Sequence, residues 1–428
     1  MHGVPSAAAS QGGPVEPAQR RWRSTWALLG PAFVAAVAYV DPGNFATNFA
    51  GGASYGYRLL WVIVAANLMA MLIQSLTAKL GLATGRDLAS LCREHLPRPV
   101  TWGLWVQAEA VAIATDLAEV VGGAVALNLL FGIPLPIGGL MTAAVAFGLL
   151  SAQTRGYRPF EAVVTGLLAV IALGFAYTLL VSGLDPGGLA RGLVPGFTDT
   201  DSVLLASGIL GATVMPHVIY VHSALTPGRY RSVIGSAEVD GPPSTSAVRR
   251  VLRAQRLDVL LAMGGAGLIN ATMLIVAAQL FAGSSAAGTL EGAHASLAST
   301  AGSGAALAFA LALLASGFAA SSVGTFAGQV VMAGFLQRQI PLWVRRGLTL
   351  APALVVLGLG ADPTTALVWS QVVLSFGIPF ALIPLVIFTA RQSLMGDLVN
   401  RAATTLAASA VAALIVGLNA FLLWDLAT

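Results

Sequence analysis

Charge is scarce in this sequence: Asp, Glu, Lys and Arg make up 9% of the 428 residues, whereas hydrophobic residues make up 57%. The mean hydropathy is +0.81, and together these values exclude an ordinary soluble protein. The single cysteine, Cys92, excludes a disulfide framework. We also find no paired nucleophile and base, no His-x-x-x-His helix and no phosphate-binding loop, so an enzyme is the least favoured class.

Long apolar stretches dominate instead. Windows of about 18 or more mostly apolar residues predict an all-α polytopic membrane protein with about eleven spans in the lipid bilayer. The windows lie near residues 26–50, 59–82, 101–126, 136–153, 160–183, 202–226, 257–283, 301–333, 342–360, 364–390 and 402–425.

The basic residues fall on alternate connections between these windows. All but Arg58 and Arg191 of the 22 Lys and Arg residues lie on one predicted side. This asymmetry predicts a cytoplasmic N-terminus and an extracytoplasmic C-terminus. It also accounts for a net charge of +4 without a nucleic-acid partner. Residues 1–23 are predicted to be a disordered cytoplasmic tail, because the stretch before the first arginines is rich in Ala, Pro, Gly and Ser.

The first apolar window contains the segment Ala38-Tyr39-Val40-Asp41-Pro42-Gly43-Asn44. Pro42 has no N–H, so the Ala38 carbonyl loses its helical partner, and the proline ring disfavours a helical conformation at Asp41. We therefore predict a broken helix. A carboxylate, a bare carbonyl and the Asn44 amide are tolerated at this depth only inside protein or beside a wet cavity, where they offer hard oxygen ligands to a cation.

The same pattern, Ala-x-Val-x-Pro within an apolar window, recurs in Ala212-Thr213-Val214-Met215-Pro216-His217. Pro216 frees the Ala212 carbonyl, and Met215 takes the place that Asp41 has in the first copy. Two broken helices at corresponding positions indicate an inverted-repeat transporter with a site near the membrane midplane. The predicted repeats cover residues 24–183 and 201–390, and an eleventh span at 402–425 lies outside them.

Met215 bears on which cation would bind. A thioether favours Mn²⁺, Fe²⁺, Co²⁺ or Cd²⁺ over Ca²⁺ or Mg²⁺. The alternative is that this methionine only fills space at the break.

Two segments, Asp41–Asn48 and Met215–Ser223, resemble the first and sixth helices of the Nramp (natural resistance-associated macrophage protein) family of proton-coupled divalent metal transporters. The likeness extends to Thr115–Glu119 and to Ser370-Gln371. It implies a LeuT-like fold: a 5+5 inverted repeat with broken helices 1 and 6, and an eleventh transmembrane helix as in bacterial members. The metal ligands that it implies are Asp41, Asn44, Met215, the carbonyls of Ala38 and Ala212, and in some conformations Gln371.

A proton path is predicted beside this site. Glu109, Asp116 and Glu119 recur at spacings that place them near one helical face. The family resemblance favours Asp116 and Glu119 as proton carriers, with His217 as a link to the metal site. Arg345 and Arg346 are candidate countercharges, and a static polar network that holds helices together is the alternative.

The sequence thus predicts a secondary active importer of Mn²⁺ or Fe²⁺, and also Cd²⁺ or Co²⁺, coupled to or accompanied by protons in the bacterial cytoplasmic membrane. No cofactor and no obligate protein partner is expected, because the metal ions and protons are substrates. A cation-coupled amino-acid transporter on the same architecture is disfavoured, since Asp41 would repel an anionic substrate. A passive channel is disfavoured because no repeated pore loop is visible.

Overall fold

The computed structural model describes residues 30–153, 157–234, 245–283, 288–337 and 341–427. The predicted tail at 1–23 lies outside these ranges. All regular structure in the described residues is helical. The elements are α1 (Pro31–Ala38), α2 (Pro42–Tyr55), η3 (Gly56–Leu59), α3 (Leu60–Thr84), α4 (Leu88–His95), α5 (Arg98–Phe131), α6 (Leu135–Gln153), α7 (Tyr157–Ser182), α8 (Pro186–Gly192), α9 (Thr200–Thr213), α10 (Pro216–Ile234), α11 (Thr245–Phe281), α12 (Leu290–Thr300), α13 (Ser303–Leu336), α14 (Leu342–Gly358), α15 (Pro363–Thr389), α16 (Gln392–Met395), η6 (Gly396–Leu398) and α17 (Ala402–Ala427).

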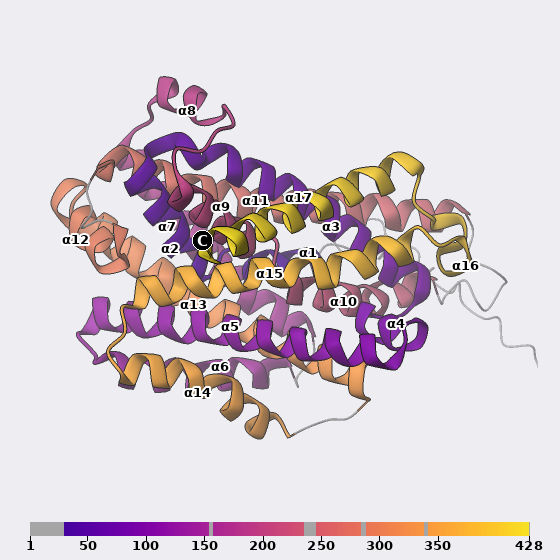
Figure 1. Cartoon of the computed structure of the whole chain (residues 1–428). Helices are drawn as coiled ribbons and strands as arrows, with labels where there is room; N and C mark the ends of the chain where they lie inside the picture. Colours follow the sequence, from indigo (N-terminus) through magenta and orange to yellow (C-terminus); the bar gives the residue numbers. More distant parts are fainter. Residues whose placement is uncertain (1–29, 154–156, 235–244, 284–287, 338–340, 428) are drawn as a thin grey trace, which may run out of the picture.

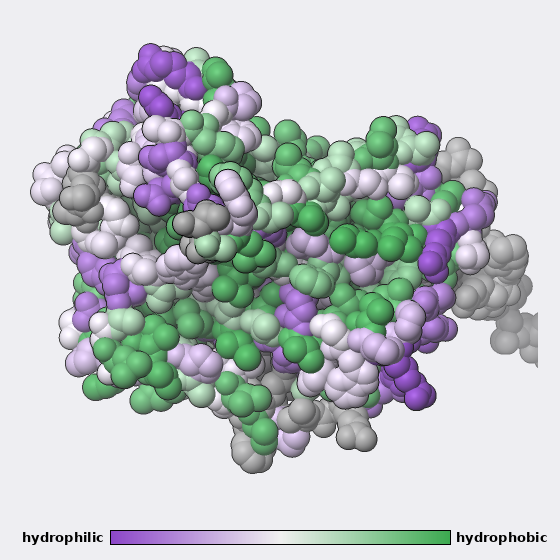
Figure 2. Space-filling model, viewed as in Figure 1, coloured by the Kyte–Doolittle hydropathy of each residue, from purple (hydrophilic) through white to green (hydrophobic). Residues whose placement is uncertain are grey.

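The long helices run side by side as a bundle, with α4 and α16 at one end and α8 and α12 at the other (Figure 1). Figure 2 shows hydrophobic atoms along the middle of this face and hydrophilic atoms mainly toward the two ends. Among the described residues, eight stretches are long and apolar enough to cross a membrane, and 135–148 and 347–358 form shorter apolar helices. One stretch, 42–84, holds both α2 and α3, so every predicted window has a helical counterpart.

Both predicted helix breaks are confirmed. Helix α1 ends at Ala38 and α2 begins at Pro42, while α9 ends at Thr213 and α10 begins at Pro216. The predicted repeat limits at 183, 201 and 390 fall within a residue of helix ends. The equivalence of the two halves stays a prediction.

Helix α1 is held at its start by a residue far away in the sequence. Its N-cap, Gly30, offers no side chain. The Asp258 carboxylate of α11 accepts instead from the N–H groups of Gly30 and Ala32, both at 3.0 Å. A carboxylate at a helix N-terminus satisfies free donors and complements the helix dipole, so this bond fixes α1 against α11.

Short helices occupy connections that the sequence did not resolve. The connection at 283–300, between two predicted spans, is expected from the sequence to be a solvent-facing loop, but its second part forms α12. Thr289 caps this helix, and Leu290, Ala293 and Leu297 bury one face of it.

At the other end of the bundle, burial raises the pKa of the Cys92 thiol in α4 to about 12, so this cysteine stays protonated and is a poor ligand or nucleophile.

Helix α15 packs directly on α9 and α2. A Cβ atom at Gly211 of α9 would lie 1.9 Å from the Gln371 carbonyl oxygen of α15. Because that neighbour is a backbone atom, only glycine allows this approach.

We therefore expect Gly211→Ala to lower the free energy of unfolding by at least ~1–3 kcal/mol through overpacking. Gly265→Ala is the matched control, because a Cβ atom there meets open space. The measurement is the thermal unfolding midpoint of the purified proteins, and equal midpoints for the two variants would contradict the expected close packing.

Candidate functional site

Asp41 and Asn44 form a reciprocal cap at the first break. Asp41 is the N-cap of α2, with an extended backbone (φ −82°, ψ 170°). Its Oδ1 accepts from the Asn44 N–H at 2.8 Å, and its own N–H donates to Asn44 Oδ1 at 3.3 Å. Both side chains are buried. The capping box fixes the carboxyl group of Asp41 at the positive end of the helix dipole, so this group is held inside the bundle without a basic partner in the cap.

Gln371 of α15 completes this polar group. Its Nε2 donates to Asp41 Oδ2 at 3.3 Å and to Ser370 Oγ at 3.2 Å, whereas its Oε1 is buried with no partner among the described residues. A Cβ atom at Gly43 would lie 1.9 Å from Gln371 Nε2. Glycine at this position therefore lets the Gln371 amide reach the carboxylate.

The main-chain carbonyls at the first break differ in their partners. The Tyr39 carbonyl accepts from Asn270 Nδ2 of α11 at 2.8 Å, and the Val40 carbonyl accepts from Ser316 Oγ of α13 at 2.6 Å. No described side chain donates to the Ala38 carbonyl, and Pro42 has no N–H to offer. The Ala38 carbonyl, which is a predicted metal ligand, is therefore the one that the fold leaves available to a ligand.

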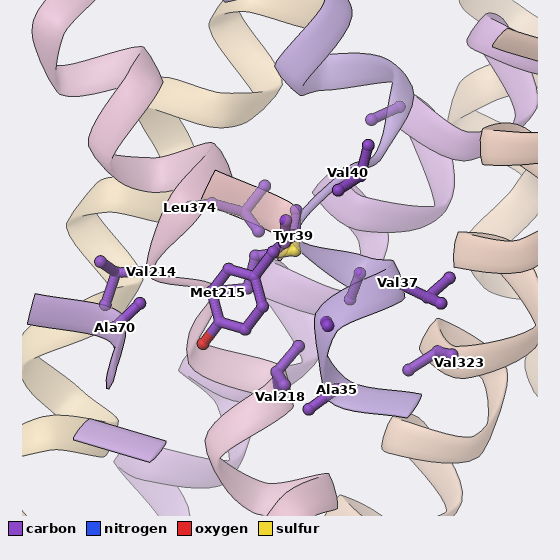
Figure 3. Packing of buried hydrophobic residues seen from close by; sticks show 14 of the residues in the cluster. Ala35, Val37, Tyr39, Val40, Ala70, Val214, Met215, Val218, Val323 and Leu374 are labelled. Carbon is purple, nitrogen blue, oxygen red and sulfur yellow. The ribbon is translucent and has the colours of Figure 1, made fainter. Parts of the chain in front are cut away.

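The second break places a sulfur atom in the same core. Val214, the C-cap of α9, leaves the helix with φ −113° and ψ 65°. Met215 follows and is 1% exposed. Figure 3 shows Val214 and Met215 clustered with Tyr39 and Val40 of the first break, and all four belong to one buried core. The broken helices also pack on each other, α1 on α10 and α2 on α9, so both breaks lie inside the bundle.

The chemistry of this donor set is unusual for a protein metal site. The described residues contain no group of three or more His, Cys, Asp and Glu side chains placed to hold a metal ion. One carboxylate, amide oxygens, carbonyls and one thioether suit a divalent ion of intermediate softness that is bound reversibly.

Hydrogen bonds and charge connect His217 to the predicted proton carriers on α5. His217 Nδ1 lies 3.3 Å from Thr115 Oγ1, and Asp116 lies close enough to interact electrostatically with the ring. His217 Nε2 is buried and has no partner among the described residues. Glu119, one turn further along α5, is buried against α13, where Gly324 leaves room for its carboxylate.

The other residues of the predicted proton path lie on α5 and α14. Glu109 is half-buried about two turns before Asp116 on α5. Arg345 and Arg346 lie on α14, which packs on α5. The side chains of these two arginines are outside the described residues, so their role as countercharges stays a prediction.

A second buried polar chain was missed by the sequence reasoning. Tyr39 Oη accepts from Gln74 Nε2 at 2.5 Å, and Gln74 Oε1 lies 2.8 Å from His222 Nδ1. Asn48 donates to Asn270, which in turn holds the Tyr39 carbonyl. The available signal was the presence of amide side chains in otherwise apolar spans, where each buried polar group requires a partner.

Comparison with known proteins decides the family. The sequence model described as natural resistance-associated macrophage protein-like matches residues 32–425. This chain belongs to the Nramp family. It is similar to the divalent metal cation transporter MntH of Deinococcus radiodurans, with 50% identity over 93% of this chain and 90% of the relative. The MntH of Bacillus subtilis is 49% identical over 95% and 94% of the two chains.

Solved structures agree with this assignment. The crystal structure of a manganese transporter from Eremococcus coleocola superimposes with a TM-score of 0.82 at 32% identity, covering 95% of this Nramp chain and 87% of that one. Mhp1, a nucleobase-cation-symport-1 family transporter, has a TM-score of 0.57 at 16% identity over 88% and 82% of the two chains. The second likeness shows only the fold, which is LeuT-like as expected.

We expect Asp41→Ala to weaken Mn²⁺ binding by more than ~100-fold, because even the outer hydrogen-bond partners of metal ligands contribute about 10–100-fold. Titration of the purified protein with Mn²⁺ by calorimetry measures the effect. Asp397→Ala, at an exposed aspartate outside the site, is the control. Unchanged binding in Asp41→Ala would remove this residue from the ligand set.

Proposed function

We propose that this chain is a secondary active importer of divalent transition-metal ions, with Mn²⁺ or Fe²⁺ as the main substrate and Cd²⁺ or Co²⁺ also accepted. The observation that carries the proposal is the packing of two broken helices on each other, with the Asp41 carboxyl group buried at one break and the Met215 thioether buried at the other. The names of the relatives, divalent metal cation transporter and manganese transporter, support the same class of substrate.

In this proposal the ion replaces contacts that the protein makes with itself. The Asp41 Oδ2 atom and the Gln371 amide now share a hydrogen bond. An arriving cation competes for the carboxylate and gives the unpaired Gln371 Oε1 a ligand role. The carbonyls of Ala38 and Ala212 and the Asn44 amide supply the remaining oxygens. The thioether adds preference for a softer ion over Ca²⁺.

Transport requires access from each side in turn. In the proposed orientation, with the N-terminus in the cytoplasm, the half-helices on either side of each break rock against the scaffold and open the site alternately. An inward-negative potential contributes about 2.3 kcal/mol per elementary charge per 100 mV, which drives cation import.

Protons follow a separate route in this proposal. A divalent ion at Asp41 raises the positive charge near His217 and Asp116. The added charge favours loss of a proton from this pair of residues. The proton then passes from Asp116 to Glu119 along α5, on the side that faces α13. The hydrogen bond between Thr115 and His217 supports a physical link between the metal site and this route.

The most direct test is uptake into proteoliposomes across a panel of divalent ions, with and without a pH gradient. We expect Mn²⁺, Fe²⁺, Co²⁺ and Cd²⁺ to enter, Ca²⁺ and Mg²⁺ to be excluded, and an inward proton gradient to accelerate uptake. Failure of every transition-metal ion to enter would refute the proposed function.

Met215→Ala should lower Mn²⁺ and Cd²⁺ uptake and relax exclusion of Ca²⁺, because only oxygen and amide donors remain. Met263→Ala is a matched control, since Met263 is equally buried in α11 outside the site. Initial rates with metal-sensitive dyes measure both variants. The thioether is only a packing group if ion selectivity stays unchanged in Met215→Ala.

Asp116→Asn should reduce proton movement more than metal movement, because the amide cannot carry a proton yet keeps the shape of the side chain. A pH dye and a metal dye inside the same vesicles report both fluxes. Asp185→Asn, at the N-cap of α8 at one end of the bundle, is the control. Equal loss of both fluxes would argue that Asp116 is structural.

A further inference from the structure

A cavity of about 420 Å³ lies at the end of the bundle that carries α4. It is formed by α4, the start of α5 and the end of α13. Its lining residues are Arg93, Arg98, Thr101, Trp102, Trp105, Phe335 and Leu336. Arg98 and Asp116 both lie on α5 and are about 27 Å apart along the helix axis at 1.5 Å per residue, so the cavity is separate from the metal site and the proton route.

The polar lining of this cavity consists mainly of donors. Arg93 and Arg98 each bring a guanidinium. Among the described residues, no carboxylate lines the cavity and neither arginine forms an ion pair. Trp105 Nε1 is buried and has no acceptor among the described residues. A pair of forked guanidinium donors without a carboxylate is the chemistry that binds a phosphate oxyanion.

The beginning of α5 adds to this positive field. Its N-cap is Pro97, which has no capping side chain, so the first turn carries no side-chain cap. The positive end of a 34-residue helix therefore lies beside the two arginines. Arg93 and Arg98 also repel each other in the absence of an anion, so an anion between them would join α4 to α5.

The surface next to the cavity shows which anion fits. Trp102 and Val106 are 55% and 57% exposed, and Ala110 is also exposed. These three residues are four apart and so form one stripe along α5. The stripe starts at the cavity and continues toward the middle of a membrane-spanning helix. Trp102, packed edge-to-face on Trp105 at 5.3 Å, has the position of an interfacial aromatic residue.

We propose that this cavity binds the phosphate headgroup of an anionic phospholipid, with an acyl chain lying along the stripe formed by Trp102, Val106 and Ala110. The guanidinium groups of Arg93 and Arg98 hold the phosphate, and the apolar stripe distinguishes a lipid from a free anion. Because Phe335 and Leu336 of α13 form the opposite wall, the bound lipid ties together α4, α5 and α13.

The test uses the purified full-length protein in detergent, with the thermal unfolding midpoint as readout. Dioleoyl phosphatidylglycerol should raise the midpoint, and the zwitterionic dioleoyl phosphatidylcholine should raise it much less. The shift caused by phosphatidylglycerol should fall by more than half in R93Q/R98Q. It should persist in R391Q/R401Q, a control that removes two exposed basic residues from the same predicted side of the membrane.

A large excess of inorganic phosphate tests whether the cavity binds a lipid headgroup or a free phosphate ion. We expect it to leave the midpoint unchanged, and a shift equal to that of the lipid would overturn the lipid assignment in favour of a free anion. An undiminished phosphatidylglycerol shift in R93Q/R98Q would overturn the site itself. If the double variant does not fold, the single variants R93Q and R98Q in native mass spectrometry serve the same purpose: each should lose the bound phosphatidylglycerol that the wild-type protein retains.

Discussion

The structure depends on the need to satisfy backbone carbonyls where a proline removes an N–H inside the membrane. Lipid offers no hydrogen bonds, so each freed carbonyl requires a partner within the protein. At the first break, Asn270 and Ser316 supply partners to the carbonyls of Tyr39 and Val40. The Ala38 carbonyl accepts from no described side chain and is one of the proposed metal ligands. The break is thus stabilised by side chains from two neighbouring helices, α11 and α13, which leave one of its carbonyls without a side-chain donor among the described residues.

Close packing of helices then determines what meets at the break. Gly43 and Gly211 lack side chains where α15 approaches α2 and α9, and this places Gln371 between the two broken helices. The side-chain amide of Gln371 lies against Gly43, and its main-chain carbonyl lies against Gly211. Small residues serve here in the way usual for membrane helices, by allowing backbone approach. The same packing brings the Asp41 carboxyl group and the Gln371 amide, which are 330 residues apart in the sequence, into hydrogen-bond contact.

Much of this arrangement is predictable from the sequence, because its cause is local. A proline removes the helical hydrogen bond four residues earlier wherever it occurs, so both breaks and their carbonyls follow from Pro42 and Pro216. The partners of those carbonyls do not follow, since Asn270 and Ser316 lie 231 and 276 residues away from the groups that they hold. Helix α12 was missed because the apolar positions that it buries are few among Gly, Ala and Ser. Family resemblance supplied the role of Gln371, for which no local pattern exists.

The Asp258 carboxylate, which receives the first N–H groups of α1, sets an energetic preference on the conformations of this half-helix. A charge-assisted hydrogen bond contributes roughly 1.5–3 kcal/mol, and two of them meet on one buried carboxylate. Any movement that carries α1 away from α11 breaks both of these hydrogen bonds. These bonds therefore favour the position of the half-helix against α11, and a conformation without them has to make up their free energy through other contacts.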